Sequence, residues 1–113
     1  MLTISDQHLA AHEREQRQRS DALAVQWYRQ QGDRLPQCSP EFLRGLLAQA
    51  HETAELVGLE PDEDLRLRLL MVFHSLMPEP SDDQWLLGID VVFDVSSPDE
   101  AIGCLRRLAG PVS

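Results

Sequence analysis

The stretch Leu65–Met77, LRLRLLMVFHSLM, constrains the fold of this chain more than any other segment. Wound as a helix, it carries apolar residues on nearly every side, and a helix that is hydrophobic all round is buried. The acidic segment Glu60–Asp64 precedes it, and the proline-containing segment Pro78–Pro80 follows it. We therefore expect a short central helix that is covered by the other elements of a small domain.

Signals for helix starts and stops recur along the chain. Serines stand where helix N-caps are expected, at Ser5, Ser39, Ser81 and Ser97, and the last two fit the capping box S-x-x-Q/E. Glycines stand where left-handed C-caps are expected, at Gly32, Gly58 and Gly110. These signals predict an all-α fold, a single compact domain over residues 1–113, with helices near 5–31, 40–57, 61–76, 82–94 and 98–109.

The segment 86–95 leaves two conformations open. Gly88–Val95 is rich in β-branched residues, which favour strands. A lone strand would have no partner elsewhere in the chain, so a helix is the preferred interpretation.

The first predicted helix is long and only partly amphipathic. Glu13–Asp21, EREQRQRSD, has no apolar residue. A helix that is polar all round for two turns either projects into solvent or lies against another protein. Opposite charges at i,i+4 spacing would help it to persist, in the pairs Glu13–Arg17 and Glu15–Arg19.

The net charge of −9 is unevenly distributed. Residues 1–34 carry five arginines and five acidic residues, so the whole imbalance lies beyond them. Such a surface repels phosphate backbones, which argues against binding to nucleic acid or to an anionic membrane. Its acidity is explained either by solubility or by a basic protein partner.

The chain has no apolar run near the ~20 residues that a membrane span needs. Its start, MLTISDQH, has neither a basic region nor an apolar core, so we expect no signal peptide and a location in the bacterial cytoplasm. Cys38 and Cys104 stand alone and are expected to be reduced thiols.

Residue chemistry predicts no catalytic, metal or cofactor site. His8 and His12 lie one turn apart, but no third ligand is expected near them. His74 falls in the central helix and is interpreted as a hydrogen-bonded core histidine. The paired carboxylates lie at predicted helix N-termini, where capping accounts for them. We expect a protein that is not an enzyme and binds no cofactor.

Three stretches resemble a family of small helical proteins that are encoded beside bacterial type VI secretion effectors and accompany larger adaptor chaperones. They are MLTISDQHLAAHE with the following Trp27-Tyr28 pair, PEFLRGLLAQAHETAELVGL, and EDLRLRLLMVFHSLMPEP. The similarity covers most of the chain and rests on apolar patterns. It ends after Pro78, where many members have Phe-Asp and Leu-Pro-Trp and this chain has Pro80–Trp85.

The resemblance implies a non-catalytic co-chaperone that binds an adaptor chaperone, an effector or both. Two alternatives stay open: an acidic immunity protein that neutralises a cognate toxin, and a helical interaction module unrelated to toxins. A homodimer is compatible with a thin core and a long polar helix. The candidate partner-binding residues are the basic residues of the first helix and three aromatic residues, which belong either to an interface or to the core edge: Arg14, Arg17, Arg19, Trp27, Tyr28 and Trp85.

Overall fold

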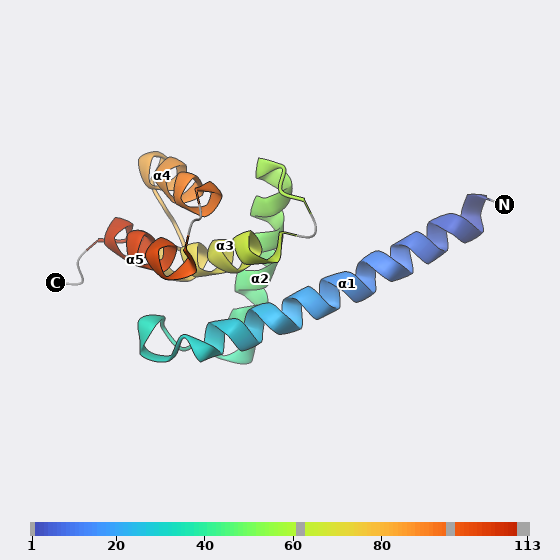
Figure 1. Ribbon diagram of the computed structural model, residues 1–113, viewed down its shortest axis with the longest axis horizontal. Helices are drawn as coiled ribbons and strands as arrows, with labels where there is room; N and C mark the ends of the chain where they lie inside the picture. Colours follow the sequence, from blue (N-terminus) through green and yellow to red (C-terminus); the bar gives the residue numbers. More distant parts are fainter. Residues whose placement is uncertain (1, 61–62, 95–96, 111–113) are drawn as a thin grey trace.

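The computed structural model describes residues 2–60, 63–94 and 97–110, and within these ranges it contains helices and no strand (Figure 1). This confirms the predicted all-α fold of a single compact domain. A short 3-10 helix, η1 (Gly32–Arg34), follows the first α-helix. The α-helices in chain order are α1 (Leu2–Gln30), α2 (Pro40–Val57), α3 (Asp64–Leu76), α4 (Asp82–Phe93) and α5 (Pro98–Leu108).

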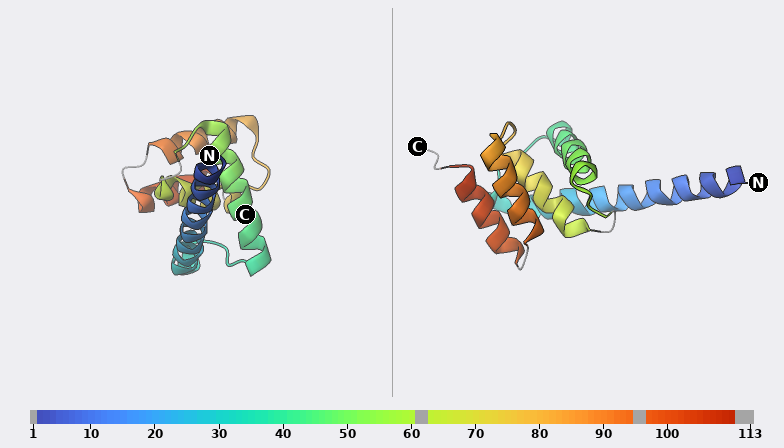
Figure 2. Two further views of the ribbon diagram at one scale, coloured as in Figure 1. Left: turned by 90° about the vertical axis from the view of Figure 1, so that its right-hand side faces the viewer. Right: turned by 90° about the horizontal axis from the view of Figure 1, so that it is seen from above.

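Helix α3 lies at the centre of the domain and packs against α1, α2, α4 and α5 (Figures 1 and 2). Five consecutive side chains, Leu69–Phe73, are completely buried. Helices α4 and α5 also pack against each other. The sequence prediction of a buried central helix is therefore confirmed. The helices that pack around α3 form the surface of the domain.

Helix α1 has two parts with different surroundings. Ala24 and Tyr28, one turn apart near its C-terminal end, are completely buried in the core. Residues 11–19 are all exposed, and Figure 1 shows this half of α1 extending beyond the rest of the molecule. The molecule accordingly measures 60 × 27 × 25 Å along its principal axes.

The predicted start of the first helix is wrong. Helix α1 begins at Leu2, so Ser5 lies inside the helix and is not its N-cap. No proline or glycine stands between Leu2 and Ser5, and adding residues to an existing helix costs much less than starting one. A serine that could act as an N-cap marks the start of a helix only where the residues before it favour another conformation.

The other helix boundaries agree with the sequence signals more closely. Ser39 accepts a hydrogen bond from the Phe42 N–H, and Gly58 has a φ of 76° at the C-cap of α2. Ser81 and Gln84 form the predicted capping box of α4. Ser97 is the N-cap of α5, as predicted, but its side chain makes no capping hydrogen bond, so the predicted capping box is wrong in that half. The predicted start of the third helix at residue 61 lies outside the described residues.

Residues 86–93 are helical, which confirms the preferred interpretation of this segment; residue 95 lies outside the described part. Helix α4 approaches α3 closely at Gly88. A Cβ atom added to Gly88 would lie 1.9 Å from Cε2 of the buried Phe73 ring. The absence of a side chain at Gly88 therefore allows α4 to lie directly on the Phe73 ring.

One polar pair lies in the core between α2 and α3. The Nε2 atom of His74 is 2.8 Å from the Thr53 hydroxyl, and both side chains are buried. Burial lowers the pKa of His74 below its usual value, and the charge of Glu52 offsets part of this effect. The interpretation of His74 as a hydrogen-bonded core histidine is confirmed.

This pKa shift predicts a pH-dependent contribution to stability. The unfolded chain takes up a proton on His74 at higher pH than the folded chain does, so stability falls as the pH decreases through about 6.5. Glutamine at position 74 keeps a hydrogen-bonding group and does not titrate. Urea unfolding between pH 8 and pH 5 should show a steeper loss of stability for the unsubstituted chain than for His74→Gln. Parallel pH curves would contradict this prediction.

Candidate protein-binding surfaces

The three aromatic candidates do not form an exposed cluster. Tyr28 is completely buried, so its prediction as a partner-binding residue is wrong. Trp27 and Trp85 are partly buried and pack against the core. The Trp85 ring lies 5.8 Å from the Phe73 ring, centroid to centroid, in an edge-on arrangement at 62°. Core packing therefore accounts for most of the surface of these side chains.

The Tyr28 hydroxyl is part of the connection between α1 and α2. It donates a hydrogen bond of 2.5 Å to the Pro36 carbonyl and lies 3.5 Å from the Cys38 sulfur. Burial, together with the neighbouring Cys38, raises the pKa of Tyr28 to about 12, and a hydrogen bond with Ser75 opposes part of this shift. Tyr28 thus holds the chain that follows η1 against the end of α1.

Removal of this hydroxyl should weaken the fold without changing its shape. Tyr28→Phe removes the shorter of two donors to the Pro36 carbonyl and leaves the Cys38 thiol at 3.4 Å, so we expect a loss of about 0.5–1.5 kcal/mol in the free energy of unfolding. Urea unfolding followed by circular dichroism measures this loss. A variant as stable as the unsubstituted chain would show that the hydrogen bond contributes nothing.

We call residues 11–19 of α1 the arm. All nine side chains of the arm are exposed. Arg14, Arg17 and Arg19 make no ion pair or hydrogen bond with any described residue, and the predicted i,i+4 pairs of Arg17 and Arg19 are not formed. Long exposed side chains gain little from such pairs because water screens the charges. The three guanidinium groups are therefore free to bind a partner.

Two polar contacts hold α1 to the body of the protein where the arm begins. The Ser20 hydroxyl donates a hydrogen bond of 2.7 Å to Oδ1 of Asp64 in α3. The adjacent Asp21 has its Oδ1 atom 2.6 Å from Nε2 of His51 in α2. These contacts, together with the buried Ala24 one turn on, fix the direction in which the arm leaves the body.

A groove of about 560 Å³ lies between the arm and the body. Arg14 and Arg17 line it on one side, whereas Arg19 does not line it. The body side of the groove is largely acidic or apolar, and it is formed by His51, Ala54, Glu55, Leu59, Glu60, Glu63 and Leu67. A partner chain seated there would contact both the arm and the ends of α2 and α3.

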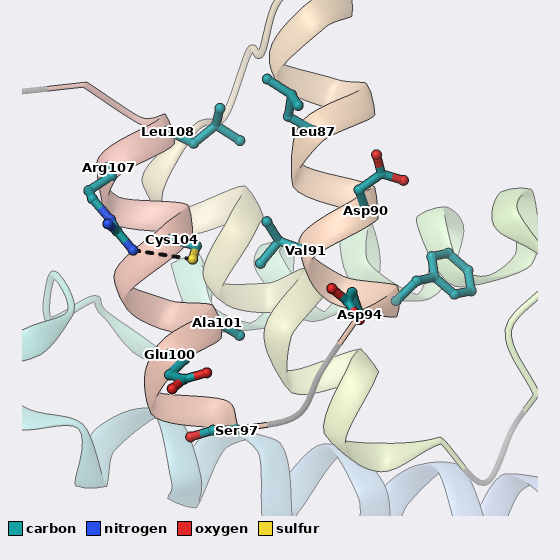
Figure 3. Close-up of a pocket in the computed structure, with 11 residues that line it drawn as sticks. Leu87, Asp90, Val91, Asp94, Ser97, Glu100, Ala101, Cys104, Arg107 and Leu108 are labelled. Carbon is teal, nitrogen blue, oxygen red and sulfur yellow. Dashed lines mark hydrogen bonds between the residues drawn. The ribbon is translucent and has the colours of Figure 1, made fainter.

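A larger groove, of about 970 Å³, lies between α4 and α5, and we call it the α4–α5 groove (Figure 3). Leu87 and Val91 line it from α4, and Leu108 lines it from α5. The sequence analysis did not identify this surface. The signal was the number of apolar residues in Trp85–Phe93, which exceeds what one face of a short helix can bury.

None of the helices described has the length and apolar character required to cross a membrane. Within the described residues, no three or more His, Cys, Asp or Glu side chains gather into a group that could hold a metal ion. No protein-family model, curated protein or solved structure matches this chain.

Proposed function

We propose that this protein is a non-catalytic co-chaperone that binds an adaptor chaperone, an effector or both during type VI secretion effector delivery. The observation that supports this function best is the arm, whose side chains are all exposed and whose three arginines make no ion pair within the described part of the chain. The sequence resemblance supports a role in type VI effector delivery, and the exposed arm supports binding to another protein.

The arm suits protein binding because it is already helical before a partner arrives. An isolated helix of nine residues is unstable in water, but the arm continues a helix whose other end is packed in the core. A partner therefore does not have to supply the free energy that orders it. Each free guanidinium group can form charge-assisted hydrogen bonds with carboxylates of the partner.

A second candidate is an immunity protein that binds and neutralises a cognate toxin. The observation that favours it is the acidity of the α4–α5 groove, which Asp90, Asp94 and Glu100 line. An acidic surface can cover the cationic active site of a nuclease toxin and accelerate association by electrostatic attraction. This candidate predicts a toxin, and no adaptor chaperone, as the partner.

The experiment is affinity purification of the tagged full chain from the producing bacterium, followed by identification of the proteins that accompany it. The proposal predicts an adaptor chaperone or a secreted effector in stoichiometric amounts. Recovery of a toxin alone would support the immunity candidate. Recovery of neither would contradict both functions and leave a helical module without a link to toxins.

A further inference from the structure

The outer side of α4 exposes an unusual number of large apolar side chains. Leu86 is 65% exposed, Leu87 is 53% exposed and Phe93 is 39% exposed, all within a helix of 12 residues. Leu87 and Phe93 line the α4–α5 groove, together with the half-buried Val91 and Leu108. Contiguous exposed apolar surface of this kind marks interaction sites in soluble proteins.

Carboxylates surround the apolar part of this groove. Asp90 on α4, Asp94 directly after α4 and Glu100 on α5 are among the residues that line the groove, and all three are labelled in Figure 3. Arg107 is the one basic residue that lines it, and its guanidinium group donates hydrogen bonds to the Gly103 carbonyl and to the Cys104 sulfur, each at 3.4 Å. The groove is therefore apolar at its base and acidic around it.

The position of two of these carboxylates is unfavourable for the helix itself. Asp90 lies near the end of α4 and Asp94 is its C-cap, where the helix dipole disfavours negative charge. The last turn of α4 has no basic residue of its own, but Arg66 of α3 lies at this end, where its guanidinium donates a hydrogen bond of 3.5 Å to the Phe93 carbonyl and lies 5.1 Å from the centre of the Phe93 ring. Asp90 and Asp94 receive no opposite charge from the last turn of α4, and a cationic partner could supply one.

We infer that the α4–α5 groove binds an amphipathic helix of a partner protein, with apolar residues on one face and lysines or arginines beside that face. This inference rests on the proposed function to the extent that the chain acts by binding proteins. Helix-in-groove recognition uses apolar side chains at i, i+3, i+4 and i+7 as anchors. Flanking basic residues would pair with Asp90 and Asp94.

The charge of the groove selects this occupant over others. A second copy that packed its own groove against this one would bring the same carboxylates face to face, and opposed like charges disfavour association. The arm of a second copy is polar over Glu13–Arg19 and offers no apolar side chains for Leu87 and Val91. Helices α4 and α5, which form the groove, lie toward the end of the molecule opposite to the arm in both views that show the long axis horizontally (Figure 1 and the right panel of Figure 2). The arm and the groove can therefore hold two different proteins at once.

The two free cysteines allow a direct test on the full chain. Cys104 lines the groove, whereas Cys38 lies beside Tyr28 and lines no part of it. The probe is an 18-residue helical peptide with leucines on one face and lysines elsewhere, and its twin has glutamate in place of every lysine. Mass spectrometry follows the rate at which iodoacetamide alkylates each thiol with and without each peptide.

A saturating amount of the lysine peptide should slow alkylation of Cys104 at least about fivefold, because the bound helix covers the thiol. The lysine peptide should leave the alkylation rate of Cys38 unchanged, and the glutamate peptide should change the rate at neither thiol. An unchanged rate at Cys104, or equal slowing of both thiols, would overturn the inference. That result would stand whatever the affinity purification recovers, so the failures of the two proposals are distinguishable.

A pair of matched variants tests the charge requirement. Asp90→Asn with Asp94→Asn should weaken binding of the lysine peptide about fivefold to tenfold, since two charge pairs at the partly exposed groove are lost. The control, Asp33→Asn with Glu79→Gln, changes the net charge equally at exposed residues outside the groove. Equal affinities of the two variants would show that general attraction, and not the groove, holds the peptide.

Discussion

Replacement of Gly88 by alanine should lower the free energy of unfolding by at least about 2 kcal/mol, although alanine forms helices better than glycine does. The new Cβ atom would lie 1.9, 2.5 and 2.8 Å from three atoms of the Phe73 ring. Phe73 is completely buried, so the ring cannot move aside, and α4 must shift away from α3. The loss of packing should exceed the gain in helix propensity.

Gly103→Ala is the matched control for this substitution. Gly103 lies within α5, and an added Cβ atom would meet nothing within 4 Å. Here only the helix propensity changes, so we expect stabilisation by about 0.5–1 kcal/mol. Urea unfolding of both variants gives opposite signs if α4 packs on Phe73 as described. Stabilisation by Gly88→Ala would contradict the position of α4.

Charge reversal of the arm should abolish most partner binding and leave the fold intact. Arg14→Glu, Arg17→Glu and Arg19→Glu together replace three exposed guanidinium groups that make no ion pair with the described residues. The melting temperature should therefore stay within a degree or two of the original, about the size expected for surface substitutions. Affinity for the purified partner should fall about tenfold or more, since each lost charge pair contributes about 0.2–1 kcal/mol and each new glutamate repels the carboxylates of the partner.

The control for the arm carries the same change of net charge on the body of the protein. Arg29, Arg44 and Arg106 are exposed and lie outside the arm. Their joint replacement by glutamate should weaken binding much less than the arm variant does. Equal weakening by both triple variants would show that only total charge matters, and the arm would then be solvated surface.

The fold was largely predictable because the strongest signals were local. The apolar residues on all sides of Leu65–Met77 demanded burial, and α3 is the central helix. The sequence Ser81-Asp82-Asp83-Gln84 contains both halves of a capping box, and the structure forms it. Ser5 misled the prediction because a cap signal does not show whether the residues before it are also helical.

The binding surfaces were harder to predict because they depend on which way side chains face. Trp27 and Tyr28 are adjacent, so they point about 100° apart on α1, and only Tyr28 is completely buried. The i,i+4 spacing of Ala24 and Tyr28 was the available signal for this orientation. The α4–α5 groove joins residues from two helices, and no pattern within either helix specifies their packing.

The most direct test of the proposed function is deletion of the gene in the producing bacterium, with secretion of the effector and survival measured in the same strain. The co-chaperone function predicts that secreted effector falls sharply while the cells stay resistant to their own toxin. Restoration by the unsubstituted chain, but not by the arm variant, should accompany this result. Normal secretion together with sensitivity to the cells' own toxin would contradict the co-chaperone function and establish an immunity role.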